Sequence, residues 1–302
     1  MVVNVPDELG GTKKLNDNYE IPMIGLGISR ITDQNSLNDA IEAALRSGYR
    51  LFDTAHIYAN ESQLGNALQL NLTKFGLTRS DVFITTKVPI VDENTSDWVK
   101  THLRESLTKL QTDYLDLVLV HYPRDRFTGS DGNRELNQTG RRLVWEELEE
   151  AQARGLIRSI GVSNYTIYHL EEMDSYAKVK PVLNQIEFHP YLTIDQIRSY
   201  CATKNVFVQA FSSLCWANQD ILNEPVVQLL AAKYSVSPQI ILYTFALNTG
   251  VGIIPKSATP SRIEDNIKKT AAIRLEKTDI FLLMQLDQNK AFCPGCQCWR
   301  VL

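Results

Sequence analysis

Short apolar or β-branched runs alternate along the chain with longer segments in which apolar residues recur at helical spacing. Two parallel strands can be joined only through a connection of about helix length, so this alternation predicts an all-parallel sheet. Eight runs are candidate strands: Met23–Gly27, Tyr49–Thr54, Val82–Lys87, Leu115–His121, Ile157–Ser163, Val182–Glu187, Val206–Phe211 and Gly252–Pro255.

Helical spacing is clearest in Ser36–Ser47, where apolar residues stand at positions 37, 40, 41, 44 and 45. Four further segments are similar: Trp98–Leu110, Leu143–Arg154, Ile194–Thr203 and Ile240–Asn248. The continuous apolar run Leu115–Val120 is typical of a strand that is buried on both faces. We therefore expect an α/β fold of the (β/α)8 TIM-barrel type. A doubly wound open sheet of the same size is the alternative, because it alternates in the same way.

No low-complexity segment or break in composition marks a linker in the 302 residues. Because α/β barrels of this size form one unit, we expect residues 1–302 to form a single barrel domain. Ahead of the first candidate strand, Lys14–Pro22 predicts a β-hairpin with its turn at Asn16–Asn18. This hairpin is placed to plug the lower end of the barrel.

Charge and hydropathy narrow the possible partners. The net charge of −4 argues against a partner that is nucleic acid or an anionic membrane. The first residues lack a basic segment followed by an apolar run, and no apolar stretch approaches the ~20 residues of a membrane span. Five cysteines, an odd number, favour reduced thiols. We expect a cytoplasmic monomer that acts on a small molecule.

Ionisable residues stand where several candidate strands end. Asp53 closes the second strand and Tyr58 follows in its loop, Lys87 closes the third, and the apolar fourth strand runs into His121. In a barrel these strand ends share one face, where active sites lie. A structural ion pair, a surface tyrosine and a capping histidine are the ordinary explanations of each residue by itself.

Together the four residues suit the reduction of a carbonyl group. A tyrosine is a weak acid at neutral pH, and a nearby lysine ammonium is expected to lower its pKa. An aspartate keeps that lysine charged and oriented, and a histidine can hold a carbonyl oxygen as negative charge develops on it.

Several motifs occur in an order that resembles the aldo-keto reductase family, over almost the whole chain. They are IPMIGLG (21–27), LFDTAHIYANESQLGNAL (51–68), ITTKV (84–88), the run ending at His121, GVSNY (161–165), NQIEFHP (184–190) and IPKSATPSRIEDN (253–266). The resemblance implies a barrel with a C-terminal substrate loop and a catalytic tetrad of Asp53, Tyr58, Lys87 and His121. It also implies hydride transfer from NADPH to the carbonyl carbon, with Tyr58 as proton donor.

The segment Gly25–Arg30 superficially follows the G-x-G-x-x-G fingerprint of dinucleotide-binding folds. Arg30 occupies the third glycine position and no helix is predicted to begin there, so we reject such a site. We expect Gly25 and Gly27 to permit close backbone packing at the first strand–loop junction.

A better phosphate site follows the eighth strand, where Lys256 and Arg262 flank the start of a predicted helix. Helix N-termini and the loops after the last barrel strands favour anions, and arginine can grip a phosphate through two hydrogen bonds. The resemblance implies that this segment holds the 2′-phosphate of NADPH, with Asp265 and Asn266 near the adenine. Two cations on that phosphate should favour NADPH over NADH.

The resemblance also implies that Ser163, Asn164 and Gln185 hydrogen-bond the nicotinamide carboxamide. Phe211 stands where many relatives have a tyrosine that stacks on the nicotinamide ring, and its aromatic face suffices for stacking. The remaining implied cofactor contacts are Gly27, Ser212, Leu214, Ser257 and Thr259. In the same loop, Ser213 and Cys215 replace a proline and a glycine that relatives commonly carry.

Departures from the family pattern gather at the expected substrate pocket. Ser29 stands where relatives often have an aromatic residue, Pro89 follows two residues after Lys87, and Tyr122 stands where tryptophan is common. These departures predict a roomier or more polar mouth. Trp216 and Cys298 are expected to line the pocket as well. The C-terminal Cys293, Cys296 and Cys298 could suggest zinc, but a fourth ligand at suitable spacing is missing. We favour pocket-lining or surface thiols and expect no metal.

The leading hypothesis is an NADPH-dependent reductase of aldehydes or ketones. His121 favours C=O over C=C reduction, because double-bond reductases of the family carry a glutamate at that position. A family member that binds NADPH without turnover is the second hypothesis. A metal-dependent barrel hydrolase is the third, but it needs clustered histidines and carboxylates at strand ends, where His121 and Asp53 alone fit.

Overall fold

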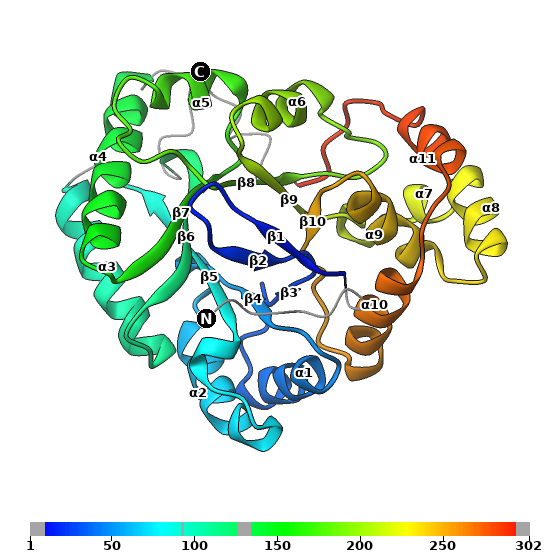
Figure 1. Ribbon diagram of the computed structural model, residues 1–302, viewed down its shortest axis with the longest axis horizontal. Coiled ribbons are helices and arrows are strands. Elements are labelled where there is room, and N and C mark those ends of the chain that lie inside the picture. Colours follow the sequence, from blue (N-terminus) through cyan, green and yellow to red (C-terminus); the bar gives the residue numbers. More distant parts are fainter. Residues whose placement is uncertain (1–9, 92–93, 126–133, 294–302) are drawn as a thin grey trace.

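Eight parallel strands form a curled sheet at the centre of the computed structural model, with helices around it (Figure 1). The structure describes residues 10–91, 94–125 and 134–293. The strand order is β10-β9-β8-β7-β6-β5-β4-β3, so neighbours in sequence are neighbours in space. The strands are β3 (Leu26–Gly27), β4 (Leu51–Asp53), β5 (Phe83–Ile90), β6 (Leu115–Asp125), β7 (Ile157–Ser163), β8 (Leu183–Glu187), β9 (Phe207–Phe211) and β10 (Gly252–Ile253).

Backbone hydrogen bonds join the two ends of this sheet and close it into a barrel. The N–H of Gly25 donates to the carbonyl of Ile253 at 2.8 Å, and the N–H of Ile253 donates to Met23 at 2.8 Å. Isolated parallel bridges pair Ile24 with Ile253 and Gly27 with Lys256. The predicted (β/α)8 barrel is confirmed.

The approach of first and last strands depends on glycine. A Cβ on Gly27 would lie 2.8 Å from the carbonyl oxygen of Ile254, just after the last strand, whereas one on Gly25 would lie 2.5 Å from Leu51 Cδ2 on the neighbouring β4. Both distances are shorter than a Cβ tolerates. The interpretation of these glycines as packing residues is confirmed.

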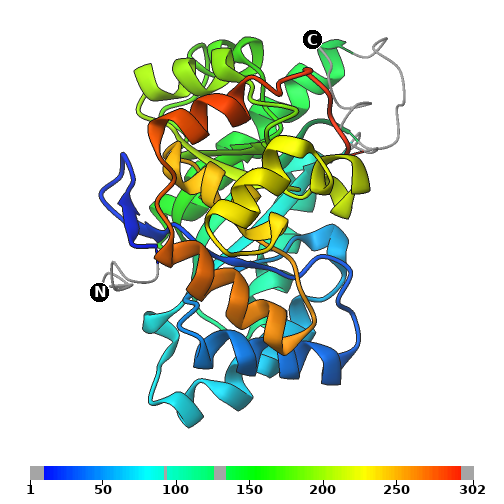
Figure 2. The same cartoon turned by 90° about the vertical axis from the view of Figure 1, so that its right-hand side faces the viewer.

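Eight helices follow the barrel strands, and further helices are added late in the chain. The barrel helices are α1 (Gln34–Arg46), α2 (Glu61–Asn71), α3 (Thr95–Leu110), α4 (Arg134–Ala153), α5 (Ile167–Met173), α6 (Asp195–Thr203), α9 (Pro238–Asn248) and α10 (Pro260–Ala272). The additional ones are α7 (Gln219–Leu222), α8 (Pro225–Lys233) and α11 (Lys277–Met284). In Figure 2 the additional helices lie on the outside of the barrel wall.

The observed boundaries differ from the predicted ones mainly where polar residues begin a helix. Helix α4 begins at Arg134, well before the predicted Leu143, because its first turns carry exposed polar residues outside the apolar period. Helices α2 and α5 lacked a predicted counterpart. Strand β7 begins and ends where predicted, whereas β6 continues past His121 to Asp125.

The N-terminal hairpin pairs β1 (Thr12–Lys14) with β2 (Glu20–Pro22) in antiparallel register, and Figure 1 shows it lying across the end of the barrel. Asn18 adopts φ 76° in the turn, a left-handed conformation that asparagine tolerates well. The Asn16 amide donates to the carbonyls of Pro181 and Asn205, in the segments leading into β8 and β9. The predicted plug is therefore confirmed.

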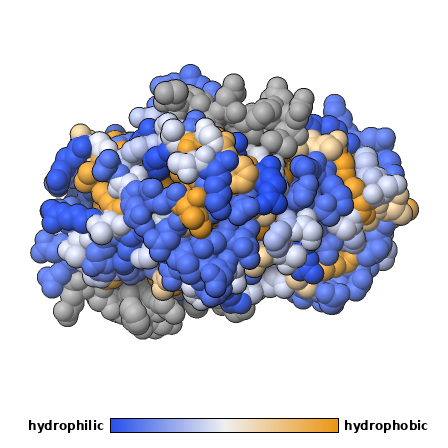
Figure 3. Space-filling view, turned by 90° about the horizontal axis from the view of Figure 1, so that it is seen from below, coloured by the Kyte–Doolittle hydropathy of each residue, from blue (hydrophilic) through white to orange (hydrophobic). Residues whose placement is uncertain are grey.

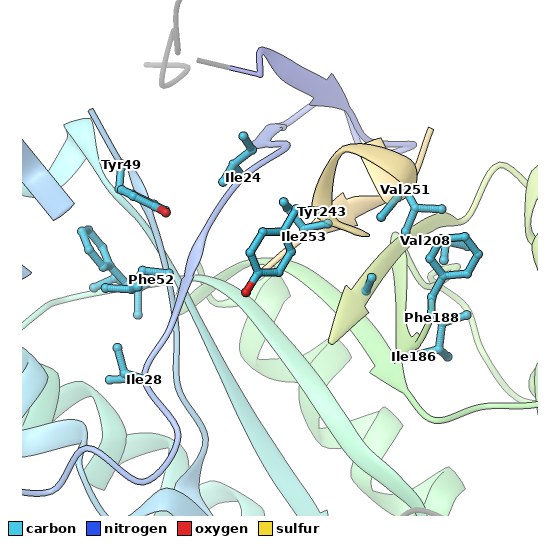
Figure 4. Packing of buried hydrophobic residues seen from close by; sticks show 14 of the residues in the cluster. Ile24, Ile28, Tyr49, Phe52, Ile186, Phe188, Val208, Tyr243, Val251 and Ile253 are labelled. Atoms are coloured by element: carbon cyan, nitrogen blue, oxygen red, sulfur yellow. The ribbon is translucent and has the colours of Figure 1, made fainter. Parts of the chain in front are cut away.

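Two apolar clusters make up the core. One includes Leu15, Ile21, Phe83 and Leu117, so the hairpin and the strands contribute to it together. The larger cluster includes Phe52, Tyr49 and Phe188, some of which appear as sticks in Figure 4. On the face shown in Figure 3, polar side chains predominate and apolar ones form separate small patches. Among the described residues, no helix is both long and apolar enough to cross a membrane.

Gly65 should be intolerant of any side chain, because α2 and α3 approach each other there. A Cβ would lie 2.3 Å from the backbone oxygen of Lys109. We expect Gly65→Ala to lower the free energy of unfolding by about 1–3 kcal/mol, the usual cost of overpacking. Leu70→Ala, on the exposed side of α2, is the control and should change it by less than about 1 kcal/mol. Urea unfolding measures both, and equal effects would contradict this account.

Candidate active site

A buried ion pair lies at the centre of the strand ends. Lys87 Nζ on β5 is 2.6 Å from Asp53 Oδ1 on β4, and both residues are at most 2% exposed. Lys87 also donates to the carbonyl of Thr54 at 2.8 Å. Burial lowers the pKa of Lys87, and the charge and hydrogen bond of Asp53 oppose that shift. The expected Asp–Lys contact is present.

Tyr58 ends a short 3-10 turn, η2 (His56–Tyr58), that follows β4. Its ring centroid lies 5.1 Å from the ammonium of Lys87. Asn60 secures the loop after the turn, since its amide donates to the carbonyls of Ile28 and Ile31. The hydroxyl of Thr54 donates to the side-chain oxygen of Asn60 at 2.7 Å, so the loop is fixed on both sides of Tyr58.

The pKa of Tyr58 differs from the expectation. Burial and then the carboxylate of Asp53 raise it above the ordinary value of 10, and a hydrogen bond with Ser29 opposes the rise. The sequence-based argument expected the ammonium of Lys87 to lower this pKa. That ammonium is paired with Asp53, which cancels much of its influence, so Tyr58 stays protonated at neutral pH.

His121 lies on β6 next to Tyr58. The two rings are 5.8 Å apart between centroids at an interplanar angle of 82°, and His121 is 3% exposed. The ring of Tyr122 stacks on His121 with centroids 4.4 Å apart. The four predicted tetrad residues are thus brought together by β4, β5, β6 and the turn after β4.

The three residues predicted to meet a nicotinamide carboxamide lie beside this group and are hydrogen-bonded among themselves. The hydroxyl of Ser163 donates to the backbone oxygen of Gln185 at 2.7 Å. The Asn164 amide donates to the backbone oxygen of His121 at 2.9 Å. Gln185 Nε2 donates to Asp53 Oδ2 at 2.9 Å and to Gln209 Oε1 at 2.8 Å. One polar network therefore joins these residues to the ion pair.

The predicted phosphate segment lies between β10 and α10. Thr259 is the N-cap residue of α10 and Pro260 its first residue, while Ser257 is buried and accepts a hydrogen bond from the N–H of Thr259. Lys256 and Arg262 are exposed at this end of the helix. Asp265 pairs with Lys269 at 2.8 Å, and Asn266 is largely buried.

The loop after β9 carries four residues other than glycine in left-handed conformations. They are Ser212, Cys215, Trp216 and Ala217, with φ between 49° and 63°. Cys215 stands where the family resemblance implies a glycine. Its backbone has the left-handed conformation that glycine adopts easily, and its thiol is buried. The indole of Trp216 lies under the guanidinium of Arg30, 4.1 Å from its Cζ, so the loops after β3 and β9 touch.

Other predicted pocket residues lie at the same end of the barrel. Ser29 contacts Tyr58, Tyr122 stacks on His121, Pro89 is on β5 near Lys87, and Trp216 is 48% exposed. Cys298 lies outside the described residues. Phe211 ends β9 with a partly exposed ring, and Leu214 follows it.

Sequence reasoning missed several polar residues that hold the site together. Thr54, Asn60 and Gln209 are fully buried, and each hydrogen-bonds within the network described above. The signal available in the sequence was a polar residue inside or next to an apolar strand, as with Gln209 in β9. Such a residue needs a buried partner, but the sequence does not say which.

Comparison with known proteins agrees with this geometry. The model of the aldo/keto reductase family matches residues 23–288. Methylglyoxal reductase DkgA of Escherichia coli is 36% identical over 281 residues, which cover 93% of this chain and 95% of that protein. Glyoxal reductase of Bacillus subtilis is 36% identical over 262 residues, or 87% and 88% of the two chains. The chain belongs to the aldo/keto reductase family.

Solved structures lead to the same family. The crystal structure of an aldo/keto reductase from Brucella melitensis superposes with a TM-score of 0.80 at 33% identity, covering 94% of this chain and all of that one. The fold and the family resemblance inferred from the motifs are both confirmed. As an aldo/keto reductase the protein is an oxidoreductase, and the site described above is the part of the barrel suited to that chemistry.

Removal of the Lys87 charge should destabilise this aldo/keto reductase strongly. Lys87→Met leaves the carboxylate of Asp53 buried without its cation, which typically costs about 3–5 kcal/mol of unfolding free energy. Lys204→Met is the control, because its ion pair with Asp174 is exposed and should contribute about 1 kcal/mol or less. Denaturant unfolding at pH 7 compares the two, and similar losses would refute the importance of burial here.

Proposed function

We propose that the protein reduces aldehydes or ketones to alcohols with NADPH, and that Tyr58 donates the proton. The observation that carries the proposal is the position of Tyr58 between the buried Asp53–Lys87 pair and His121. These groups form a compact set of one acid, one cation and one hydrogen-bonding ring at the end of the barrel where catalytic residues usually lie.

The raised pKa of Tyr58 makes its phenol a weaker acid than a free tyrosine, so proton donation depends on stabilisation of the phenolate that forms. Burial keeps the phenol protonated at neutral pH, so the proton is present when the substrate arrives. Once it leaves, the phenolate stands near the ammonium of Lys87, which stabilises the negative charge. His121 would hold the carbonyl oxygen by a hydrogen bond as that oxygen becomes negative. A proton from solvent then restores Tyr58.

The residues present fit a nicotinamide cofactor. Phe211 offers a partly exposed aromatic face at the end of β9, and Ser163, Asn164 and Gln185 offer hydroxyl and amide groups. Lys256 and Arg262 offer two exposed cations at the start of α10 for the 2′-phosphate. When bound, the cofactor supplies the hydride that reduces the carbonyl carbon.

Small α-dicarbonyl compounds are the substrate class we favour. Two of the similar proteins are named methylglyoxal reductase and glyoxal reductase. The small side chains of Ser29 and Pro89 at the same end of the barrel are also compatible with a small, hydrated polar substrate.

Tyr58→Phe should abolish turnover without loss of folding. It removes the hydroxyl proton and keeps the ring, so we expect the consumption of NADPH with methylglyoxal to fall by at least about 100-fold. Tyr114→Phe is the matched control, because Tyr114 donates to the backbone of Arg79 in the segment leading into β5. If wild type shows no activity above Tyr58→Phe while both bind NADPH, the protein binds the cofactor without turnover and the reductase proposal fails.

Arg262→Ala should weaken NADPH binding far more than NADH binding. Loss of a charged hydrogen bond to phosphate costs about 1.5–3 kcal/mol, or roughly 10- to 100-fold in Kd. Quenching of protein fluorescence by each cofactor measures both affinities. Arg274→Ala, which removes an arginine that bonds the carbonyl of Ala271 at the far end of α10, should leave both unchanged. Equal loss for NADH and NADPH would contradict a 2′-phosphate site.

A further inference from the structure

Two histidines that the proposed reaction does not use meet behind the turn that carries Tyr58. His56 is the first residue of the 3-10 turn, and His102 lies on α3. Their ring centroids are 4.6 Å apart with an interplanar angle of 85°, an edge-to-face contact. The sequence placed them far apart and indicated no common role.

Trp98 completes this cluster. Its indole stacks on His102 with centroids 3.5 Å apart and planes within 13°, and His56 lies beside this stack, 5.1 Å from the indole centroid at an interplanar angle of 82°. His102 Nδ1 is 2.8 Å from the backbone oxygen of Trp98, one turn earlier in the helix. Stacking on the indole holds the His102 ring and this hydrogen bond adds to that hold, so α3 presents a pair of stacked rings to His56.

The turn itself has little internal support. Two backbone hydrogen bonds, from Tyr58 to Ala55 and from Ala59 to His56, hold it, and Ala59 is left-handed with φ 53°. A three-residue 3-10 turn is a weak unit, and its position is set by what holds its side chains. The hydrogen bond between Thr54 and Asn60 ties together the chain before and after the turn, and the contact of His56 with α3 is a further hold on the first residue of the turn itself.

We propose that Trp98 and His102 are positioning residues for Tyr58, and that they act through His56. The proposal rests on the role of Tyr58 as proton donor proposed above. The two α3 rings fix His56, His56 fixes the start of the turn, and the turn sets the distance from the Tyr58 hydroxyl to the substrate oxygen. Misplacement of a reacting group by about 1 Å can cost roughly 100-fold in rate.

The cluster is also sensitive to pH. Burial lowers the pKa of His56 below 6.5, and the nearby His102 and Lys109 lower it further, while Glu105 opposes them. These three side chains on α3 are the charged or titratable groups that act on His56. The pKa of His56 is lower in the folded state than in the unfolded state, so the neutral ring stabilises the native contact above pH 6.5. That stabilisation is lost as the pH falls through the folded pKa.

Kinetics of four variants test the positioning role. At pH 8 we expect Trp98→Leu and His102→Leu to lower kcat roughly 10-fold or more, with KM and the Kd for NADPH within about two-fold of wild type. His102→Phe keeps a flat ring for the stack and should retain wild-type kcat. Leu103→Ala removes a buried residue on the neighbouring stripe of α3, and controls for general destabilisation of that helix.

NMR titration of the histidine rings tests the coupling without any turnover. Removal of the His102 side chain in His102→Phe should raise the pKa of His56. The pH below which kcat falls should then shift upward by a similar amount. Three results would each overturn the proposal. The first is an unchanged pKa of His56 in His102→Phe. The second is a loss of kcat in Leu103→Ala equal to that in Trp98→Leu, and the third is a His102→Phe variant as slow as His102→Leu. Failure of the reductase proposal looks different, since wild type and Tyr58→Phe would then be equally inactive.

Discussion

The buried Asp53–Lys87 ion pair is the constraint on which the upper half of the barrel depends. Two opposite charges that are almost wholly removed from water are tolerated only if their remaining hydrogen-bonding groups are satisfied. Lys87 therefore donates to Thr54, and Asp53 accepts from Gln185, which in turn donates to Gln209. This chain of bonds links β4, β5, β8 and β9 at one height in the barrel. Tyr58 and His121 lie next to this hydrogen-bonded network.

The two ends of the barrel are built differently for that reason. The lower end is filled by apolar side chains and covered by the hairpin, whose Asn16 and Asp17 bond the barrel. The upper end keeps polar side chains in its hydrogen-bonded network. Long connections leave it, such as the loop after β9, which leads through α7 and α8 to α9. That loop contains strained backbone and an exposed contact between Arg30 and Trp216.

Some features could be predicted from sequence because they follow from local patterns. Strand β7 was predicted at its observed bounds, because Ile157, Ile160 and Val162 form a short β-branched run after the clear helical segment that ends at Arg154. The start of α4 could not be predicted from periodicity, because exposed polar residues carry no signal of which side faces the core. The proximity of Asp53, Tyr58, Lys87 and His121 could be predicted because polar residues at the ends of parallel strands share one face. The predicted lowering of the Tyr58 pKa was wrong, because the pKa is raised by burial and by the carboxylate of Asp53. Both effects depend on the folded structure.

The sequence by itself determined the alternation that makes a parallel barrel, the glycines that let it close, and the residue types that stand at its strand ends. These follow from periodicity and from side-chain size, which are local properties. The tertiary structure alone decided which polar groups are paired, in which direction the pKa of Tyr58 shifts, and that His56 meets His102 and Trp98 behind the turn that carries Tyr58. Such properties depend on desolvation and on contacts between distant segments, and both exist only once the chain has folded.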